Sequence, residues 1–217
     1  MENAKGERGD TTFYLIRHGE TEMNVKGQMQ GQIDSPLTNK GIEQAEETRK
    51  TFAGINFDVV FSSDLLRAQR TAELVVLEKK LVVNTSKLIR ERAYGRYEGK
   101  IFKEYEQENR NILDELRKVS NVEYMNYKIS PDVESGEEMV ARTITFLREV
   151  AVTYTGKTVL VVSHGGLIRN LLIHLGWANR HELPSGAIKN CGYVKLRSDG
   201  VDFWVDSVYK VEKGVRV

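Results

Sequence analysis

Short apolar runs alternate along this chain with stretches of helical periodicity. The runs with strand character are residues 12–16, 59–62, 81–84 and 158–163. Between and after them, apolar positions recur every three or four residues in segments that begin near Thr38, Asp64, Lys100, Ser135 and His164. Strands that alternate with helices in this way are typical of an α/β protein with a largely parallel sheet.

Local capping signals mark two of the helix starts. Ser135 and Glu138 have the spacing of a capping box, and apolar residues follow them at helical intervals. Thr38 follows Pro36 and is a suitable N-cap residue. We therefore expect helices to begin directly after Thr38 and Ser135.

The C-terminal part of the chain has a different pattern. Residues 191–197 and 201–208 are rich in β-formers and flank Ser198-Asp199-Gly200, which resembles a hairpin turn. We expect these two strands to extend the sheet at one end in antiparallel orientation. Their exposed edges could pair with a second copy of the chain, so a homodimer is one expectation.

Residues 101–133 stand apart from both patterns. They are rich in charge, carry several aromatic residues and show few strand signals. Long insertions often cover active sites, so we expect a helical lid here, with a solvated pair of helices as the alternative.

Composition limits the classes of protein to consider. The chain has 217 residues, of which 40% are hydrophobic, enough for one well-buried core, and we expect a single domain over residues 11–217. Residues 1–10 are polar and lack the apolar middle of a signal peptide, so we expect a flexible lead-in. The net charge of +1 argues against a nucleic-acid binder that works through a strongly basic surface.

The chain also lacks signs of a membrane or an oxidising environment. No apolar run approaches the roughly 18 residues of a membrane span. Cys191 is the one cysteine, so it cannot form an internal disulfide, and we interpret it as a small buried residue rather than a nucleophile. These features predict a cytoplasmic protein that does not bind membranes.

Polar residues suited to phosphate chemistry follow the expected strands. Arg17-His18-Gly19 ends the first strand, and His164-Gly165-Gly166 ends the fourth. Ligands of open α/β folds bind beyond the carboxyl ends of the strands, so both histidines should face one crevice. Arg67 follows the second strand, and if Ser63 caps the next helix, Arg67 lies about one turn into it.

Hydrolysis of a phosphate ester without a metal needs a nucleophile, cations for the phosphoryl oxygens and an acid for the leaving group. Neutral histidine is a capable nucleophile, and arginine binds two phosphate oxygens at once. Taken singly, Arg67 and Glu91 could be surface residues and His164 a core histidine. Their occurrence at successive strand ends favours a joint anion site.

The ordered series of motifs resembles the histidine phosphatase superfamily, the phosphoglycerate mutase-like family. It extends over residues 13–190 and consists of Arg17-His18-Gly19-Glu20-Thr21 with Asn24, Gly31-Gln32-Ile33-Asp34-Ser35-Pro36-Leu37-Thr38, Ser62-Ser63-Asp64-Leu65-Leu66-Arg67-Ala68, Glu91-Arg92-Ala93-Tyr94-Gly95 and His164-Gly165-Gly166. The resemblance implies a three-layer α/β/α fold with a mostly parallel mixed sheet, and no metal or organic cofactor.

The resemblance also implies roles for single residues. His18 would be the phosphorylated nucleophile, Glu91 the proton donor, and the remaining phosphate pocket would comprise Arg17, Arg67 and His164. The expected substrate-binding positions are Asn24, Gln30, Gly31, Tyr94 and Gly165, with Met23, Gln32 and the 101–133 insertion as further walls. Lys100, Lys103 and Arg110 could bind a second anionic group, but a solvated helix face explains them better.

Three departures from the mutase pattern favour a phosphatase. Gly166 stands where the cofactor-dependent mutases have asparagine, Ala93 stands where they have histidine, and the insertion lacks their Arg-Arg pair. We expect hydrolysis of phosphate monoesters of small metabolites, either sugar phosphates or phosphoglycerate-like acids. The segment from Glu91 to Gly99 is similar both to broad-specificity phosphatases and to sugar-bisphosphatase regulators.

Other functions remain as alternatives. They are a phosphoglycerate mutase, a catalytically silent module that binds a phosphorylated ligand, and a metallohydrolase. The last is the weakest, because neither His18 nor His164 has further ligands at metal-binding spacing.

Overall fold

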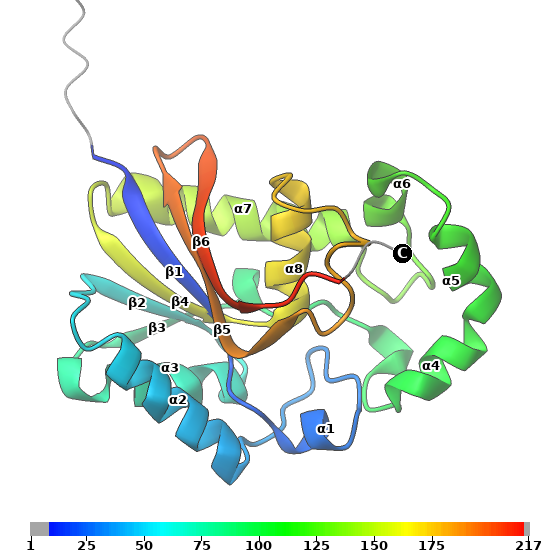
Figure 1. Ribbon diagram of the computed structural model, residues 1–217, viewed down its shortest axis with the longest axis horizontal. Helices are drawn as coiled ribbons and strands as arrows, with labels where there is room; N and C mark the ends of the chain where they lie inside the picture. Colours follow the sequence, from blue (N-terminus) through cyan, green and yellow to red (C-terminus); the bar gives the residue numbers. More distant parts are fainter. Residues whose placement is uncertain (1–8, 215–217) are drawn as a thin grey trace, which may run out of the picture.

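One mixed sheet organises the part of the chain that the computed structural model describes, residues 9–214 (Figure 1). Its strand order is β3-β2-β4-β1-β5-β6. The strands β1 to β4 run parallel to one another, whereas β5, beside β1, and β6 are antiparallel additions, as expected. The strands are β1 (Thr11–Arg17), β2 (Val59–Ser63), β3 (Val83–Ser86), β4 (Thr158–Ser163), β5 (Ile188–Ser198) and β6 (Phe203–Val211).

Helices cover both faces of this sheet. They are α1 (Glu22–Val25), α2 (Asn39–Thr51), α3 (Leu66–Val76), α4 (Phe102–Glu108), α5 (Arg110–Leu116), α6 (Asn121–Asn126), α7 (Gly136–Thr153) and α8 (Gly165–His174), with short 3-10 turns η1 (Leu77–Lys79), η2 (Lys87–Ile89) and η3 (Gly95–Tyr97). The expected caps are confirmed: the Thr38 hydroxyl accepts from the Gly41 N–H, and Ser135 forms a capping box with Glu138.

The alternation of side chains along the strands builds two apolar layers. On one face, Phe13 and Val161 pack with residues of α7 and α8. On the other, Ile16 and Leu160 pack with residues of α2 and α3. This is the three-layer α/β/α arrangement (Figure 1).

Several element boundaries differ from the expected ones. The strand expected at 81–84 is β3, Val83–Ser86, because η1 and the left-handed residue Lys80 occupy the chain before it. The last strand begins at Phe203, not at 201, since the Asp199 carboxylate accepts from the N–H groups of Val201 and Asp202 and extends the turn. Helix α4 begins at Phe102, two residues after Lys100.

The start of α3 was also predicted wrongly. The helix begins at Leu66, and its N-cap residue Leu65 makes no side-chain cap bond. Instead, the Asp34 carboxylate accepts a 2.8 Å hydrogen bond from the Leu66 N–H. Ser63 therefore does not cap the helix, and Arg67 lies in its first turn.

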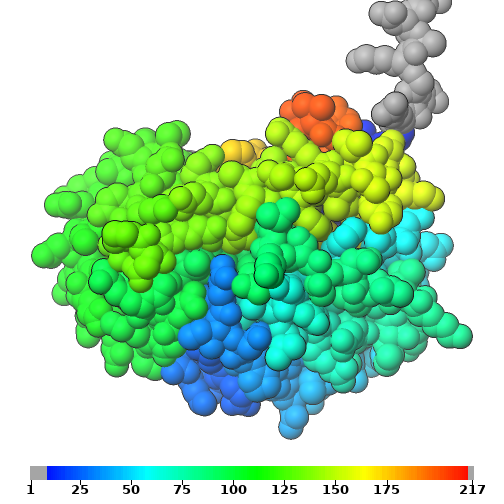
Figure 2. All heavy atoms as spheres, turned by 180° about the vertical axis from the view of Figure 1, so that it is seen from behind, coloured from blue at the N-terminus to red at the C-terminus, as the bar shows by residue number. Residues whose placement is uncertain are grey.

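Residues 101–133 form a helical insertion, as expected. Helices α4, α5 and α6 lie beyond one end of the sheet (Figure 1), and their green spheres gather at one end of the molecule in Figure 2. Between residues 9 and 214, no helix is long and apolar enough to cross a membrane. Of the predicted lead-in, residues 1–8 lie outside the described part of the chain, and Thr11 begins β1.

Candidate active site

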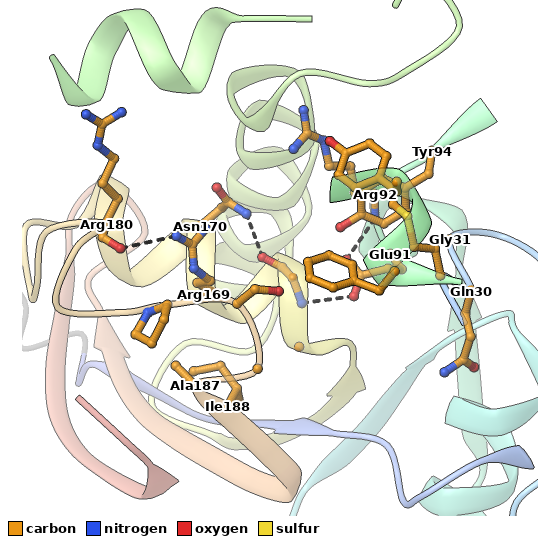
Figure 3. A pocket seen from close by; sticks show the side chains of 18 of the residues that line it. Gln30, Gly31, Glu91, Arg92, Tyr94, Arg169, Asn170, Arg180, Ala187 and Ile188 are labelled. Atoms are coloured by element: carbon orange, nitrogen blue, oxygen red, sulfur yellow. Dashed lines mark hydrogen bonds between the residues drawn. The ribbon is translucent and has the colours of Figure 1, made fainter. Parts of the chain in front are cut away.

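A cavity of about 1100 Å³ lies at the carboxyl ends of β1 and β4. Arg17 and His18 line it from the end of β1, and Gly165 lines it from the start of α8. The insertion contributes much of the opposite wall through Phe102, Tyr105, Leu113, Leu116 and Tyr124. The strand ends and the insertion therefore enclose one site, which Figure 3 shows from close by.

His18 is buried, with 3% of its surface exposed, and its tautomer follows from its contacts. Nδ1 lies 2.7 Å from the Gly19 carbonyl, which can only accept, so Nδ1 carries the proton. Burial, together with the charges of Arg67 and Arg17, holds the pKa of His18 well below its usual 6.5. The imidazole is therefore neutral at pH 7, and Nε2 has a free lone pair.

The Arg17 and Arg67 guanidinium groups lie beside His18, and main-chain carbonyls fix both. Arg67 donates to the carbonyls of Ile33 and Gly31 at 2.7 Å each, and Arg17 donates to the carbonyl of Ile188 at 2.6 Å. Among the described residues, neither Nε atom has a hydrogen-bond partner, although both atoms are buried. Burial lowers the pKa of Arg67 to about 10, so its charge persists at neutral pH.

His164 belongs to the same group of buried nitrogen atoms, but, unlike His18 and contrary to expectation, it does not line the cavity. Its ring centroid lies 5.3 Å from that of His18, and the residue is fully buried. Neither ring nitrogen has a partner within residues 9–214. Burial, followed by the charge of Arg67, holds its pKa well below 6.5. Buried polar atoms are nearly always hydrogen-bonded, so unpartnered nitrogens here indicate the place of a ligand.

Glu91 is positioned by two main-chain donors. One carboxylate oxygen accepts from the Arg92 N–H at 2.8 Å, and the other accepts from the Gly166 N–H at 2.9 Å (Figure 3). Gly166 must be a glycine for this contact, because a Cβ there would lie 2.5 Å from Glu91 Oε1. The glycine pair after His164 thus brings the carboxylate against the first turn of α8.

The expected substrate-binding residues all line the same cavity. Asn24 belongs to the capping box of α1 and also accepts from the Asn190 amide at 3.3 Å. The Oε1 atom of Gln30 is buried without a partner in the described chain. Gly31 has a φ of +53°, which disfavours other residues. Burial raises the pKa of Tyr94, so its phenol stays protonated.

Some expectations about the walls were wrong. Met23 and Gln32 do not line the cavity, and the Gln32 side chain instead accepts from Arg90. None of Lys100, Lys103 and Arg110 lines the cavity, which agrees with solvated positions. Lys100 precedes α4 and therefore does not lie on a helix face, and it pairs with Glu108. The surface interpretation of Arg67 was wrong, since 1% of it is exposed, whereas Cys191 is buried as expected.

Other lining residues had no signal in the sequence. Arg169 and Asn170 reach the cavity from α8, and the loop of residues 179–188 forms a further wall (Figure 3). No strand end or motif marked this loop. Across residues 9–214, no three His, Cys, Asp or Glu side chains group closely enough to hold a metal ion.

Comparisons with known proteins agree with this geometry. The sequence profile of the histidine phosphatase superfamily (branch 1) matches residues 13–210. The chain is 33% identical over 180 residues to the uncharacterized phosphatase PhoE of Bacillus subtilis, covering 83% of this chain and 84% of that protein. It is 32% identical over 187 residues to a 2,3-bisphosphoglycerate-dependent phosphoglycerate mutase of Methylocella silvestris, covering 81% and 86%.

Solved structures give the same result. YhfR of Bacillus stearothermophilus superposes with a TM-score of 0.79 at 28% identity, covering 90% of this chain and 95% of that one. The chain therefore belongs to the histidine phosphatase superfamily, branch 1, and is a histidine phosphatase enzyme.

Proposed function

We propose that this enzyme hydrolyses phosphate monoesters of small metabolites through a phosphohistidine on His18. The observation that carries the proposal is the set of buried, unpartnered nitrogen atoms beside a neutral imidazole: Nε of Arg17, Nε of Arg67 and both ring nitrogens of His164. The two Nε–H groups and the one protonated ring nitrogen of neutral His164 can donate to the oxygens of a phosphoryl group, which accept hydrogen bonds and carry negative charge.

In the first step, His18 Nε2 attacks phosphorus. The bond between phosphorus and the ester oxygen breaks, and Glu91 gives its proton to the leaving oxygen. The Nδ1–H bond to Gly19 holds the ring in the required tautomer and supports the positive charge that develops on it.

In the second step, water replaces the histidine on phosphorus. Glu91, now a carboxylate, accepts a proton from the attacking water, the bond between Nε2 and phosphorus breaks, and inorganic phosphate leaves. Arg17, Arg67 and His164 contact the equatorial oxygens in both steps, where negative charge concentrates. The enzyme returns to its starting protonation state.

The cavity supports a small phosphorylated metabolite as substrate. Its volume of about 1100 Å³ is at the upper end of ordinary ligand sites and leaves space beyond the phosphate pocket. Hydrolysis is preferred to isomerisation because Gly166 and Ala93 depart from the mutase pattern. A screen of mono- and bisphosphates for phosphate release identifies the substrate, and net isomerisation of 3-phosphoglycerate would favour a mutase instead.

The test of the nucleophile is His18→Ala. We expect turnover of every phosphate ester to vanish while thermal unfolding stays cooperative. His174→Ala is the matched control, since His174 lies on the exposed end of α8 away from the cavity, and it should retain activity. Substantial turnover by the folded His18→Ala variant would overturn the proposal.

A further inference from the structure

Arg142 of α7 contacts the main chain at two points of the segment that carries Glu91. Its Nη1 donates to the Leu88 carbonyl at 2.7 Å, and its Nη2 donates to the Glu91 carbonyl at 3.1 Å. The residue is 51 positions away from Glu91 in sequence. A long-range cation therefore fixes the backbone of the proposed proton donor itself.

Glu134 completes this contact from the other side. Its carboxylate pairs with Arg142 through bonds of 2.7 Å and 3.0 Å, and also accepts from the Ala93 N–H at 3.2 Å. The main-chain carbonyl of Glu134 accepts from Arg92 Nε, and the main-chain N–H of Glu134 donates to the Ala93 carbonyl at 2.9 Å. Residues 88–93 are thus held by one ion pair at several main-chain groups.

The geometry of the Arg142–Glu134 pair suits the positioning of residues 88–93, beyond any contribution to the stability of the fold. The side chains of Arg142 and Glu134 are 17% and 15% exposed, so solvent competes little for their bonds. The planar guanidinium makes four bonds, two to the Glu134 carboxylate and two to main-chain carbonyls, which is more than the three donors on the one nitrogen of a lysine can supply. Neither residue is among the described residues that line the cavity.

We propose that Arg142 and Glu134 are positioning residues for Glu91. They fix the main chain on which Glu91 stands, so that its carboxyl lies against the Gly166 N–H (Figure 3) and faces the leaving oxygen. This inference rests on the proposed function, since it assigns the pair to the proton-transfer step. The positive charge of Arg142 also contributes to the lowered pKa of His164, so Arg142 influences a second residue of the site.

The test uses leaving groups that differ in their need for a proton. kcat/KM is measured for 4-nitrophenyl phosphate, whose phenolate leaves unaided, and for an alkyl phosphate, whose alkoxide needs the acid. Loss of a general acid costs about 10²- to 10⁴-fold. We expect Arg142→Gln to lower kcat/KM for the alkyl ester by roughly tenfold or more, and that for the aryl ester by less than about threefold.

Further variants separate positioning from general damage to the fold. Arg142→Lys should fall between wild type and Arg142→Gln. Arg148→Gln is the matched control, because Arg148 lies on the same helix and donates to the Val201 carbonyl, and it should leave both rates unchanged. If Arg142→Gln does not fold, Glu134→Gln takes its place, with the same selective loss expected.

The decisive comparison is the double variant with Glu91→Gln. If Arg142 acts through Glu91, adding Arg142→Gln to Glu91→Gln lowers the alkyl rate no further. Equal losses on both esters, or fully additive losses in the double variant, would overturn the positioning role. If Glu91→Gln lowers kcat/KM equally for the alkyl and aryl esters, the assignment of Glu91 as the acid is overturned instead, so the two failures are distinguishable.

Discussion

At the scale of single residues, the site depends on two histidines that are buried and neutral. For both His18 and His164, burial is the main cause of a folded-state pKa well below 6.5. In the unfolded chain each returns to about 6.5, so below that pH the unfolded state binds more protons than the folded state. The two residues therefore weaken the folded enzyme as the pH falls.

This predicts a specific dependence of stability on pH. In phosphate-free buffer, these histidines should not affect the free energy of unfolding above pH 6.5. At pH values under 6.5, each should decrease that free energy by up to about 1.4 kcal/mol per pH unit. Urea denaturation between about pH 5 and 7 measures it, above the range in which carboxylates titrate. His18→Gln should lower the slope, because it removes one of the two buried histidines. An unchanged slope in His18→Gln would contradict the account.

A second residue-scale prediction concerns Gly166. Gly166→Ala places a Cβ 2.5 Å from Glu91 Oε1, and the carboxylate must move because it is the flexible partner. The variant should fold, since alanine is the better helix former, but kcat/KM for alkyl phosphates should fall at least about tenfold. Gly54→Ala, with open space around its Cβ, is the control. Full activity of folded Gly166→Ala would show that Glu91 need not lie there.

At the scale of elements, Arg180 connects the loop after α8 to the insertion. It is buried and donates to the carbonyls of Leu116, Arg117 and Val119, where α5 ends, and its guanidinium lies 4.9 Å from the Tyr124 ring centroid. Carbonyls at a helix C-terminus carry partial negative charge, so a buried cation suits them. The contact holds the insertion over the cavity.

Arg180→Met should loosen the insertion. Charge-assisted hydrogen bonds contribute about 1.5–3 kcal/mol each, so losing them should speed amide hydrogen exchange in residues 110–126 with little effect on β1 and β4. KM for bulky esters should rise more than KM for small ones, because the insertion forms the distal wall. Arg70→Met, whose side chain is 58% exposed on α3 and does not line the cavity, is the control. Unchanged exchange in residues 110–126 would refute the tether.

The elements also show which parts of the fold are readable from sequence. The starts of α2 and α7 were predictable because their caps, Thr38 and Ser135, lie next to the helices that they begin. The start of α3 was not, because its first donor is satisfied by Asp34, 32 positions away. Local signals fix an element's type, whereas long-range partners shift its ends.

At the scale of the whole molecule, the sheet brings distant segments to one edge. The expected pocket residues could be predicted because strand ends and an ordered motif series mark them. The walls outside the 101–133 insertion could not be predicted, because Arg169 and the 179–188 loop reach the cavity only through the tertiary fold. The contact of Arg142 with Glu91, outside the cavity lining, could not be predicted either, because it spans 51 positions. We expect Arg169 and the 179–188 loop to influence substrate preference, because they line the cavity beyond the proposed phosphate pocket.

The assembled pocket should also link ligand binding to stability. We expect inorganic phosphate to bind only the folded state, and so to raise the free energy of unfolding by about 2.7 kcal/mol at 100 times its Kd. Thermal melting at constant ionic strength measures this. Arg67→Gln should abolish the increase, because it removes a cation that contacts the anion, whereas Arg70→Gln, exposed on the same helix, should not. An equal increase in Arg67→Gln would place the phosphate elsewhere.

The central claim is that the phosphoryl group passes through His18. The most direct measurement is a rapid quench in alkali during turnover of a phosphomonoester, followed by peptide mapping of the enzyme. We expect an acid-labile phosphoryl group on His18 that forms and decays at rates competent for turnover and is absent from His18→Ala. Turnover with His18 unmodified, or with the phosphoryl group on another residue, would contradict it.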